Sequence, residues 1–224
     1  RPRWPDNVNY NLHKMKKKVS IFGSTGTIGL TALKILNKDK SLYVYNIFTA
    51  NKNFTLICKQ IKKYKPKIFI IKDVKIANRV KIKFKKNKIK ILSFDEFKKF
   101  SIEKSDLTIS AIPGIAGLIP TLKIIKKTKR LLIANKESII CGWNLIKKEL
   151  KKNNTNFIPV DSEHFSLWYG LQNLNINNIE KIFLTASGGP FYNLPLKNFK
   201  DIKVSHAIDH PNWKMGKKIS TDSA

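Results

Sequence analysis

The sequence predicts an α/β fold built around a doubly wound parallel sheet. The first indication is a short apolar strand, 19–22, that runs directly into the glycine-rich segment GSTGTIG and then into a helical pattern ending near Asn37. The second is the alternation of apolar strand segments with helical segments as far as residue 160. Repeated strand–helix units form parallel sheets, and ligands bind at the carboxyl ends of their strands.

The glycine-rich segment 23–29 has the context of a dinucleotide-binding turn, because it follows a strand and opens a helix. Its glycines would let a pyrophosphate approach the backbone and sit on the helix N-terminus. The spacing is GxxGxxG rather than GxGxxG, and a tight turn that needs glycine for its geometry alone is the alternative. The preceding strand favours the nucleotide site.

The second strand, predicted over 43–49, leads into Ala50 and then Asn51, Lys52 and Asn53. Domains that bind NAD usually place an acidic residue near this point, where it holds the ribose 2′-hydroxyl. This sequence has none, and Lys52 among polar neighbours suits a 2′-phosphate instead. NADP is therefore favoured over NAD, although a polar loop without a ligand would look similar.

The other elements follow in chain order. Further strands are predicted over 67–71, 89–92, 107–112, 130–134 and 156–160. Helices are predicted over 54–64, 74–86, 115–127 and 135–152, with a short helix that begins at a capping box formed by Ser93 and Glu96. Beyond residue 163 the pattern changes to a strand over 182–186, a donor-rich loop over 187–190 and an aromatic segment over 210–218 without clear periodicity.

Two carboxylates, Asp161 and Glu163, follow the strand 156–160. In extended chain, residues two apart point to the same side, so their oxygens would converge. Such a pair repels unless a proton or a hard cation lies between the two groups, and Mg²⁺ and Mn²⁺ prefer oxygen ligands. A solvated strand end is the alternative. Ser162 would point away from both carboxylates unless the chain turns at the strand end.

The composition bounds the classes of function. The net charge of +29 is carried by 40 lysines and only four arginines, spread along the chain beside abundant Ile and Asn. Nucleic-acid sites favour arginine forks and stacking aromatics, so the codon bias of an AT-rich genome explains the lysines more simply. They would still attract anionic substrates. Cys58 and Cys141 fit no metal or redox spacing, which favours a reducing compartment, and no apolar run reaches transmembrane length.

Six segments resemble one enzyme family in order and spacing: GSTGTIG, SAIPGIAGLIPTL, ANKES, PVDSEH, TASGGPF and HPNWKMGKKISTDSA. The family is that of the 1-deoxy-D-xylulose 5-phosphate reductoisomerases, and the resemblance runs from about residue 15 to the end. It implies NADPH-dependent isomerisation and reduction of 1-deoxy-D-xylulose 5-phosphate to 2-C-methyl-D-erythritol 4-phosphate, in the non-mevalonate route to isoprenoids. The second cofactor would be Mg²⁺ or Mn²⁺, with Co²⁺ as a further option.

The resemblance also implies a domain organisation. Residues 1–14 show no periodicity and carry two prolines, so we expect an unstructured or non-native extension before a start at Met15, with an ordered N-terminal arm as the alternative. A Rossmann-like NADPH-binding domain would span 15–150, and 151–224 would form the first part of an α+β catalytic domain. The family pattern continues with Asn-Lys-Gly-Leu-Glu, which supplies a third metal carboxylate, so we expect a C-terminally truncated form. The expected partners are a phosphorylated sugar and a second copy of the full-length chain, without nucleic acid or membrane, in the bacterial cytoplasm.

Roles follow for the positions that match the family motifs. Cofactor contacts are expected from Gly23, Thr25, Gly26, Thr27, Ile28, Asn51, Lys52, Asn53, Asn135, Glu137 and Gly216. The catalytic group would be Lys136, Asp161, Glu163 and His210, of which Asp161 and Glu163 hold the metal. Substrate contacts are expected from Lys136, Ser162, Glu163, Ser187, His210, Trp213, Met215 and Ser223, with Trp213 and Met215 in a lid. The sequence departs from the family pattern at Asn51 and at 165–168.

Two other functions stay open at this point. One is a plain NADP-dependent dehydrogenase without skeletal rearrangement, which would give an unbranched product. The other is a basic nucleic-acid-binding module, whose affinity would fall steeply with salt.

Overall fold

The structure is a computed structural model that describes residues 15–99, 103–184, 188–212, 217 and 220–221. The chain divides into two compact units, Arg1–Gln172 and Asn173–Ala224. The whole sheet lies in the first unit. This unit extends to Gln172 and so includes the last strand, Asn156–Pro159, and the helix Ser162–Gly170 that follows it. A domain boundary near residue 150 stays a prediction.

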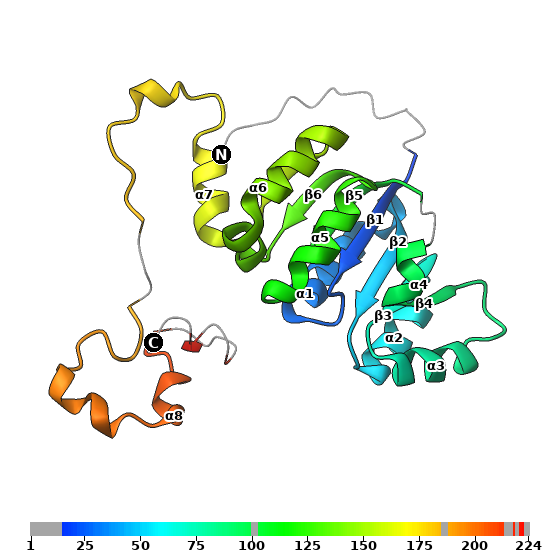
Figure 1. Ribbon diagram of the computed structural model, residues 1–224, viewed down its shortest axis with the longest axis horizontal. Coiled ribbons are helices and arrows are strands. Elements are labelled where there is room, and N and C mark those ends of the chain that lie inside the picture. The colour runs from blue at the N-terminus through cyan, green and yellow to red at the C-terminus, as the bar shows by residue number, and fades with distance from the viewer. Residues whose placement is uncertain (1–14, 100–102, 185–187, 213–216, 218–219, 222–224) are drawn as a thin grey trace. The chain divides into compact units, whose positions relative to one another are not determined.

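The first unit is a seven-stranded parallel sheet with helices on both faces (Figure 1). Its strand order is β4-β3-β2-β1-β5-β6-β7, and all neighbouring pairs are parallel. The chain moves outward from β1 to β4 and then returns to β5 on the other side of β1. The loops after β1 and β5 therefore part at a topological switch point, where such sheets bind ligands. The predicted doubly wound fold is confirmed.

The element bounds follow the predicted pattern closely. The strands are β1 (Lys17–Phe22), β2 (Tyr43–Ala50), β3 (Ile68–Ile71), β4 (Lys90–Ser93), β5 (Ser105–Ser110), β6 (Thr128–Ile133) and β7 (Asn156–Pro159). The helices are α1 (Thr27–Leu36), α2 (Phe54–Tyr64), α3 (Val74–Lys83), α4 (Phe94–Lys99), α5 (Leu118–Ile125), α6 (Lys136–Asn153) and α7 (Ser162–Gly170), with 3₁₀ turns at Asn37–Leu42 and Ile115–Gly117. Several predicted bounds were off by two or three residues: the third helix ends at Lys83, the helix predicted over 115–127 starts as a 3₁₀ turn and ends at Ile125, and the strands predicted over 107–112 and 130–134 begin at Ser105 and Thr128.

Two apolar cores, one on each face of the sheet, hold the layers together. On one face α1, α2 and α3 contribute Leu33, Ile57 and Ala77, and on the other α4, α5 and α6 contribute Phe97, Ile124 and Ile146. Burial on both faces explains why a central stretch such as β3 (IFII) is a continuous apolar run rather than an alternating one.

A β-bulge interrupts the pairing of β1 with β2 between Val19 and Ile21. As a result Tyr45 and Phe48 face the same core with ring centroids 5.3 Å apart, although they are three residues apart in β2. Ile47 faces the opposite core. A bulge disrupts the ladder locally and shifts which face each later side chain occupies. After the bulge, the pairing of β2 with β1 is shifted by one residue relative to the pairing before it.

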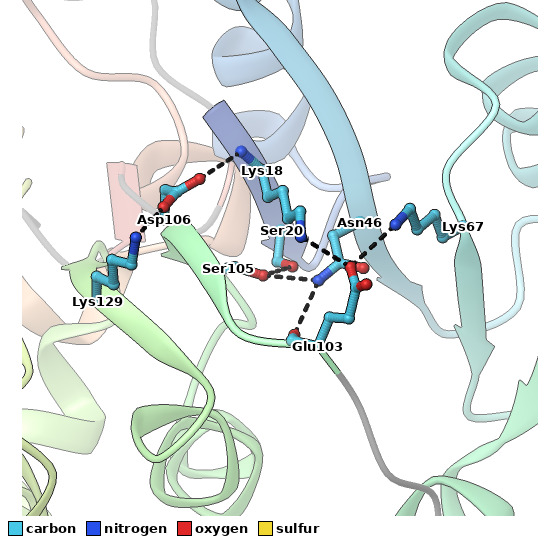
Figure 2. A network of polar contacts seen from close by, with 8 residues as sticks. All are labelled: Lys18, Ser20, Asn46, Lys67, Glu103, Ser105, Asp106 and Lys129. Atoms are coloured by element: carbon cyan, nitrogen blue, oxygen red, sulfur yellow. Dashed lines mark hydrogen bonds and ion pairs between the residues drawn. The ribbon is translucent and has the colours of Figure 1, made fainter. Parts of the chain in front are cut away.

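A buried polar network occupies the bulge (Figure 2). The Ile47 N–H donates to Ser20 Oγ at 3.2 Å, and Ser20 Oγ lies 2.7 Å from Ser105 Oγ. Asn46 Nδ2 donates to Ser105 Oγ at 2.9 Å and to the Glu103 carbonyl at 3.1 Å. Because burial of an unpaired polar group costs free energy, these bonds make the bulge tolerable in the core.

Charged groups surround this network at the amino ends of the strands (Figure 2). Glu103 pairs with Lys18 and Lys67 at 3.0 and 2.9 Å, and Asp106 pairs with Lys129 at 2.8 Å. The hydrogen bond from Lys129 and that from the Lys18 N–H outweigh the effect of burial and hold the pKa of Asp106 below its ordinary value. This edge of the sheet is therefore tied by polar contacts within the protein itself.

The predicted capping box at the start of α4 is confirmed, and it makes stability depend on pH. The Ser93 N–H donates to Glu96 Oε2 at 2.6 Å, and Lys81 Nζ lies 2.9 Å from Glu96 Oε1. These contacts lower the pKa of Glu96 from 4.5 to about 2. Since the folded state favours the ionised form, the stabilisation is complete above pH 4.5 and is lost as the pH falls towards 2.

We therefore expect Glu96→Gln to lower the free energy of unfolding at pH 7 by roughly 0.5 kcal/mol, a small value because the pair is screened by solvent. Urea titrations between pH 7 and pH 2.5 would show the difference from the wild type shrinking with acid. Glu180→Gln is the control, because Glu180 is exposed and its one ion-pair contact, with the exposed Lys181, is long at 3.4 Å. A difference that stays constant over this range would show that the Glu96 charge is not involved.

The second unit contains little regular structure. Its elements are 3₁₀ turns at Ile176–Asn178 and Leu196–Asp201 and the short helix α8 (Val204–Ala207). The predicted strand 182–186 is wrong over its described part, because 182–184 form no strand pairing and their side chains are exposed. A strand needs a neighbour to pair with, and the described residues of this unit offer none. Among the helices that the structure describes, none has the length and apolarity of a membrane span.

Candidate active site

The predicted site residues of the first unit gather at the carboxyl edge of the sheet. The loops after β1, β2, β5, β6 and β7 all leave the sheet there, because the strands are parallel. This edge lies opposite the polar network at the strand beginnings. It carries the glycine-rich loop, the polar loop after β2, the start of α6 and the two predicted carboxylates.

Two glycines of the loop after β1 are required by close backbone contacts. Gly23 has φ +85°, and a Cβ there would lie 2.6 Å from the Ala111 carbonyl oxygen. At Gly29 a Cβ would lie 2.3 Å from the Gly23 carbonyl oxygen. Gly26, by contrast, is exposed and has room for a Cβ, with its nearest neighbour at 3.4 Å. The loop therefore folds tightly beneath an open outer surface.

The N-terminus of α1 forms that outer surface. Gly26 is its N-cap without a side-chain hydrogen bond, and its first turn contains no acidic residue. Thr27 and Ile28 are exposed, and Thr25 is half-buried. Backbone N–H groups at a helix N-terminus carry partial positive charge and bind anionic groups. The arrangement fits the phosphates of a dinucleotide.

Ser24 faces inward, a position that the sequence did not indicate. It is fully buried, and its N–H donates to the Thr49 carbonyl at 2.9 Å. The Gly23 N–H donates to Thr49 Oγ1 at 2.9 Å, and the side chain of Gln60 meets Ser24 from α2. The loop is thus fastened from below to β2 and α2.

The loop after β2 presents Asn51 and Lys52 to solvent. Asn53 is the N-cap of α2, with Oδ1 accepting from the Leu56 N–H at 3.0 Å. No acidic side chain lies among these three residues. A cation beside a helix N-terminus suits a phosphate on the ribose rather than a free hydroxyl.

Asn135 joins two loops at the sheet edge. It is buried and is the N-cap of α6, with Oδ1 accepting from the Ser138 N–H at 2.8 Å. Its Nδ2 donates to the Gly114 carbonyl at 2.7 Å and also contacts the Ile112 carbonyl. The side chain is therefore occupied within the protein. Lys136, the first residue of α6, is exposed.

The chain turns at Asp161, so the prediction of an extended pair of carboxylates was wrong. Asp161 is the N-cap of α7, and its Oδ1 accepts from the His164 N–H at 3.0 Å. Ser162 and Glu163 lie in the first turn of the helix and are exposed. Aspartate is a favoured N-cap, and an acidic residue in the first turn is stabilised by the helix dipole. Asp161, Ser162 and Glu163 thereby gather at one helix N-terminus.

The Asp161 carboxylate has one oxygen engaged and one available. Oδ1 also lies 2.6 Å from His164 Nδ1, whereas the buried Oδ2 has no hydrogen-bond partner among the described residues. Burial opposes ionisation, but the hydrogen bonds from His164 outweigh it and hold the pKa of Asp161 below its ordinary value. A buried anionic oxygen without a donor fits a bound cation.

Two carboxylates are only part of a complete ligand set. Within the described ranges no group of three His, Cys, Asp or Glu side chains is placed to hold a metal ion. Asp161 and Glu163 would leave several coordination positions of Mg²⁺ or Mn²⁺ to other oxygens, as these ions commonly do with water or substrate. The residues present fit such a cation.

In the second unit, His210 is nearly buried, and its Nδ1 accepts from the Asn212 N–H at 3.2 Å. The remaining predicted site residues lie outside the described part of the chain: Ser187, Trp213, Met215, Gly216 and Ser223.

Comparison with known sequences assigns two segments of the chain to one family. A sequence profile described as 1-deoxy-D-xylulose 5-phosphate reductoisomerase matches residues 19–142. A second profile, for the C-terminal domain of the same enzyme, matches residues 157–224. The chain belongs to the 1-deoxy-D-xylulose 5-phosphate reductoisomerase family.

Individual reductoisomerases agree with this assignment. The protein of Pelagibacter ubique (strain HTCC1062) is 52% identical over 212 residues, which cover 93% of this chain and 54% of that protein. A Wolbachia pipientis relative (subsp. Culex pipiens) is 42% identical over 210 residues, with 93% and 54% covered. The chain spans about half the length of the curated relatives it matches.

Solved reductoisomerase structures share the fold. That of Zymomonas mobilis in complex with NADPH superposes with a TM-score of 0.81 at 30% identity, covering 94% of this chain and 54% of the other. A reductoisomerase in complex with NADPH, fosmidomycin and magnesium gives a TM-score of 0.80 at 30% identity, covering 93% and 54%.

One departure from the reductoisomerase pattern has a visible structural consequence. Phe165 lies on α7 with its ring 5.9 Å from that of Tyr169 and stacked on it, and 5.7 Å from that of Trp168. The aromatic residues thus pack against each other along the helix that begins at Asp161. Side-chain pairs four residues apart stabilise a helix by about 0.2–0.5 kcal/mol, so this contact contributes modestly to the helix that begins at the candidate metal ligands.

Proposed function

We propose that the protein converts 1-deoxy-D-xylulose 5-phosphate to 2-C-methyl-D-erythritol 4-phosphate with NADPH and a divalent cation. The observation that carries this proposal is that one feature suited to an anion and one suited to a cation lie at the same edge of the sheet. One is the open N-terminus of α1, and the other is the Asp161 carboxylate with its unpartnered buried oxygen. Relatives whose structures contain NADPH, fosmidomycin and magnesium support it.

In this proposal the nucleotide phosphates lie on the backbone of Thr25, Gly26, Thr27 and Ile28, and the ribose 2′-phosphate lies at 51–53. Asn135 would contact NADPH through its backbone, because its side chain is bonded to Ser138 and to the loop after β5. Glu137, in the first turn of α6, would contact the cofactor beside Asn135.

The substrate would lie between the α6 and α7 N-termini, within the first unit. Asp161 and Glu163 would hold the cation, which when bound polarises the substrate oxygens. Lys136, exposed at the start of α6, would neutralise anionic charge on the substrate, and Ser162 would donate a hydrogen bond. Further substrate roles for Ser187, His210, Trp213, Met215 and Ser223, and a cofactor role for Gly216, rest on the family motifs.

The same proposal includes assembly and location. We expect a homodimer of the full-length protein in the bacterial cytoplasm, with a phosphorylated sugar as substrate and neither nucleic acid nor membrane as partner. Both cysteines are free thiols, in accord with a reducing compartment.

The test of the function is the carbon skeleton of the product. We expect the full-length protein to oxidise NADPH when 1-deoxy-D-xylulose 5-phosphate and Mn²⁺ are present. Direct reduction without rearrangement would give an isomer of equal mass, so proton NMR must distinguish them. A methyl group on a quaternary carbon gives a singlet, whereas the unbranched product gives a doublet. A doublet would support the plain dehydrogenase instead, and tight, steeply salt-dependent binding of DNA would support the nucleic-acid module.

Cofactor choice is a separate expectation for Lys52. NADPH should bind about 10- to 100-fold more tightly than NADH, because a charge-assisted contact to the 2′-phosphate is worth roughly 1.5–3 kcal/mol. Lys52→Ala should remove most of this preference by weakening NADPH binding alone. Fluorescence titration of both cofactors measures it.

The matched control for Lys52 is Lys34→Ala, which removes an equal charge from the last turn of α1. It should change neither cofactor's dissociation constant by more than about twofold, since exposed distant charges are screened. Equal affinities of the wild type for NADPH and NADH would refute the assignment of Lys52.

A further inference from the structure

A buried glutamine on α2 contacts the glycine-rich loop from beneath. Gln60 is 3% exposed, and its Nε2 donates to the Ser24 carbonyl at 2.7 Å. Its Oε1 accepts from Ser24 Oγ at 2.7 Å. One side-chain amide thus engages both the backbone and the hydroxyl of a single loop residue. No apolar side chain of similar shape could do this.

The inner side of the loop is held from two directions, by β2 and by Gln60 on α2. The Ser24 N–H donates to the Thr49 carbonyl, and the same carbonyl lies 3.1 Å from Ser24 Oγ. On the outer side, the N-cap Gly26 makes no side-chain hydrogen bond. The direction of the loop's outer N–H groups is therefore fixed by how Ser24 is held below them.

Gln60 also links the two halves of the proposed cofactor site. It lies two turns after Asn53, the N-cap of α2, in the segment proposed to hold the ribose phosphate. Both α1 and α2 cover the same face of the sheet (Figure 1). The helix α2 contacts the phosphate loop through Gln60 and begins at the segment proposed to hold the ribose phosphate. It therefore fixes the distance between the two halves of the cofactor site.

We propose that Gln60 is a positioning residue of the cofactor site, which clamps Ser24 and presets the phosphate-binding loop before NADPH arrives. This inference rests on the proposed NADPH-dependent function. The alternative is that Gln60 only contributes to packing. If Gln60 is a positioning residue, NADPH affinity should depend on whether the side chain at residue 60 can donate a hydrogen bond. If Gln60 only packs, it should not.

Gln60→Glu separates these alternatives. An ionised carboxylate can accept from Ser24 Oγ but cannot donate to the Ser24 carbonyl, whereas a protonated carboxyl can do both. We expect NADPH to bind the variant about 10-fold or more weakly than the wild type at pH 8, because a buried acceptor loses its donor. The ratio of the two dissociation constants should return towards one as the pH is lowered to about 5.5, helped by burial, which raises carboxyl pKa values.

Asn46→Asp is the matched control. Asn46 is as buried as Gln60, and the substitution likewise replaces a donating amide with a carboxyl group. The Asn46 amide donates to two partners, whereas that of Gln60 donates to one, and the partners of Asn46 lie at the opposite edge of the sheet. We expect Asn46→Asp to lower the melting temperature yet change the NADPH dissociation constant less than threefold. Ser24→Ala, which removes the hydroxyl partner, should weaken NADPH binding several-fold and serves if Gln60→Glu does not fold.

The outcomes are distinguishable. Weak binding by Gln60→Glu at pH 8, recovery in acid and normal binding by Asn46→Asp would support the clamp. Wild-type affinity in folded Gln60→Glu at pH 8, or in Ser24→Ala, would overturn it, as would equal losses in Gln60→Glu and Asn46→Asp. Failure of the wild-type protein to bind NADPH at all would overturn the proposed function, and the clamp with it.

Discussion

Replacing Asp161 with asparagine should lower metal-dependent turnover by more than about 100-fold while NADPH binding remains. Asparagine is as good an N-cap as aspartate, so α7 and the hydrogen bond from the His164 N–H should persist. What disappears is the negative charge on a carboxylate whose buried Oδ2 has no hydrogen-bond partner in the described structure. We expect kcat/KM for 1-deoxy-D-xylulose 5-phosphate to fall by more than about 100-fold, since even outer-shell changes at metal sites cost 10- to 100-fold.

The measurement is NADPH oxidation by the full-length protein over a range of Mg²⁺ and Mn²⁺ concentrations, together with NADPH titration by fluorescence. Glu163→Gln should behave in the same way, because Glu163 lies in the same first turn. Glu180→Gln, which removes an equally charged but solvated group, should retain normal turnover. Normal activity of either site variant with both metals would show that these carboxylates do not hold the cation.

Much of the fold was predictable because its signals are local. The β-strands are apolar on both faces, since helices cover both sides of the sheet, and this produced the runs that mark β1 and β3. Helix starts were marked by their caps, as at Asn53, Ser93 and Asn135. The bulge between β1 and β2 leaves no local signal, because it arises from how the two strands pair.

The candidate site was predictable in its residues but not in their geometry. An extended reading of Asp161 and Glu163 placed them on one side of a strand, whereas the chain turns into α7 at that point. The local signal was available, since an aspartate followed by an acidic residue in the first helical turn, as Asp161 is by Glu163, is typical of a helix start. The roles of Ser24 and Gln60 could not be found in this way, because the two residues lie 36 positions apart in the sequence.

The segment 182–184 shows the opposite failure, in which a local signal lacked its partner. Its apolar residues favour a strand by composition, but strand structure requires a neighbouring backbone, and none of the described residues supplies one. The exposed side chains of Phe183 and Leu184 are the consequence. Propensity therefore predicts what a segment can form, and pairing decides whether it does.

Gly29→Ala should weaken NADPH binding severely. An added Cβ would lie 2.3 Å from the Gly23 carbonyl oxygen and 2.8 Å from Ser24 Cα, both backbone atoms that cannot rotate away. The loop must therefore shift, at a cost of about 1–3 kcal/mol in stability. Because a displacement of about 1 Å in a binding site can cost on the order of 100-fold, we expect the NADPH dissociation constant to rise by at least that factor.

Two other glycines serve as controls, which test whether the effect comes from the steric contact at Gly29 and not from replacing a glycine in general. Alanine normally stabilises a helix relative to glycine by about 1 kcal/mol, so Gly170→Ala, at the open end of α7 with no atom within 4 Å, should leave both stability and NADPH binding unharmed. Gly26→Ala meets only one atom at 3.4 Å and should weaken NADPH less than Gly29→Ala does. Thermal melts and NADPH titrations of the three variants decide the matter. If Gly29→Ala bound NADPH as tightly as Gly170→Ala, the loop would not be the rigid phosphate cradle that its backbone contacts indicate.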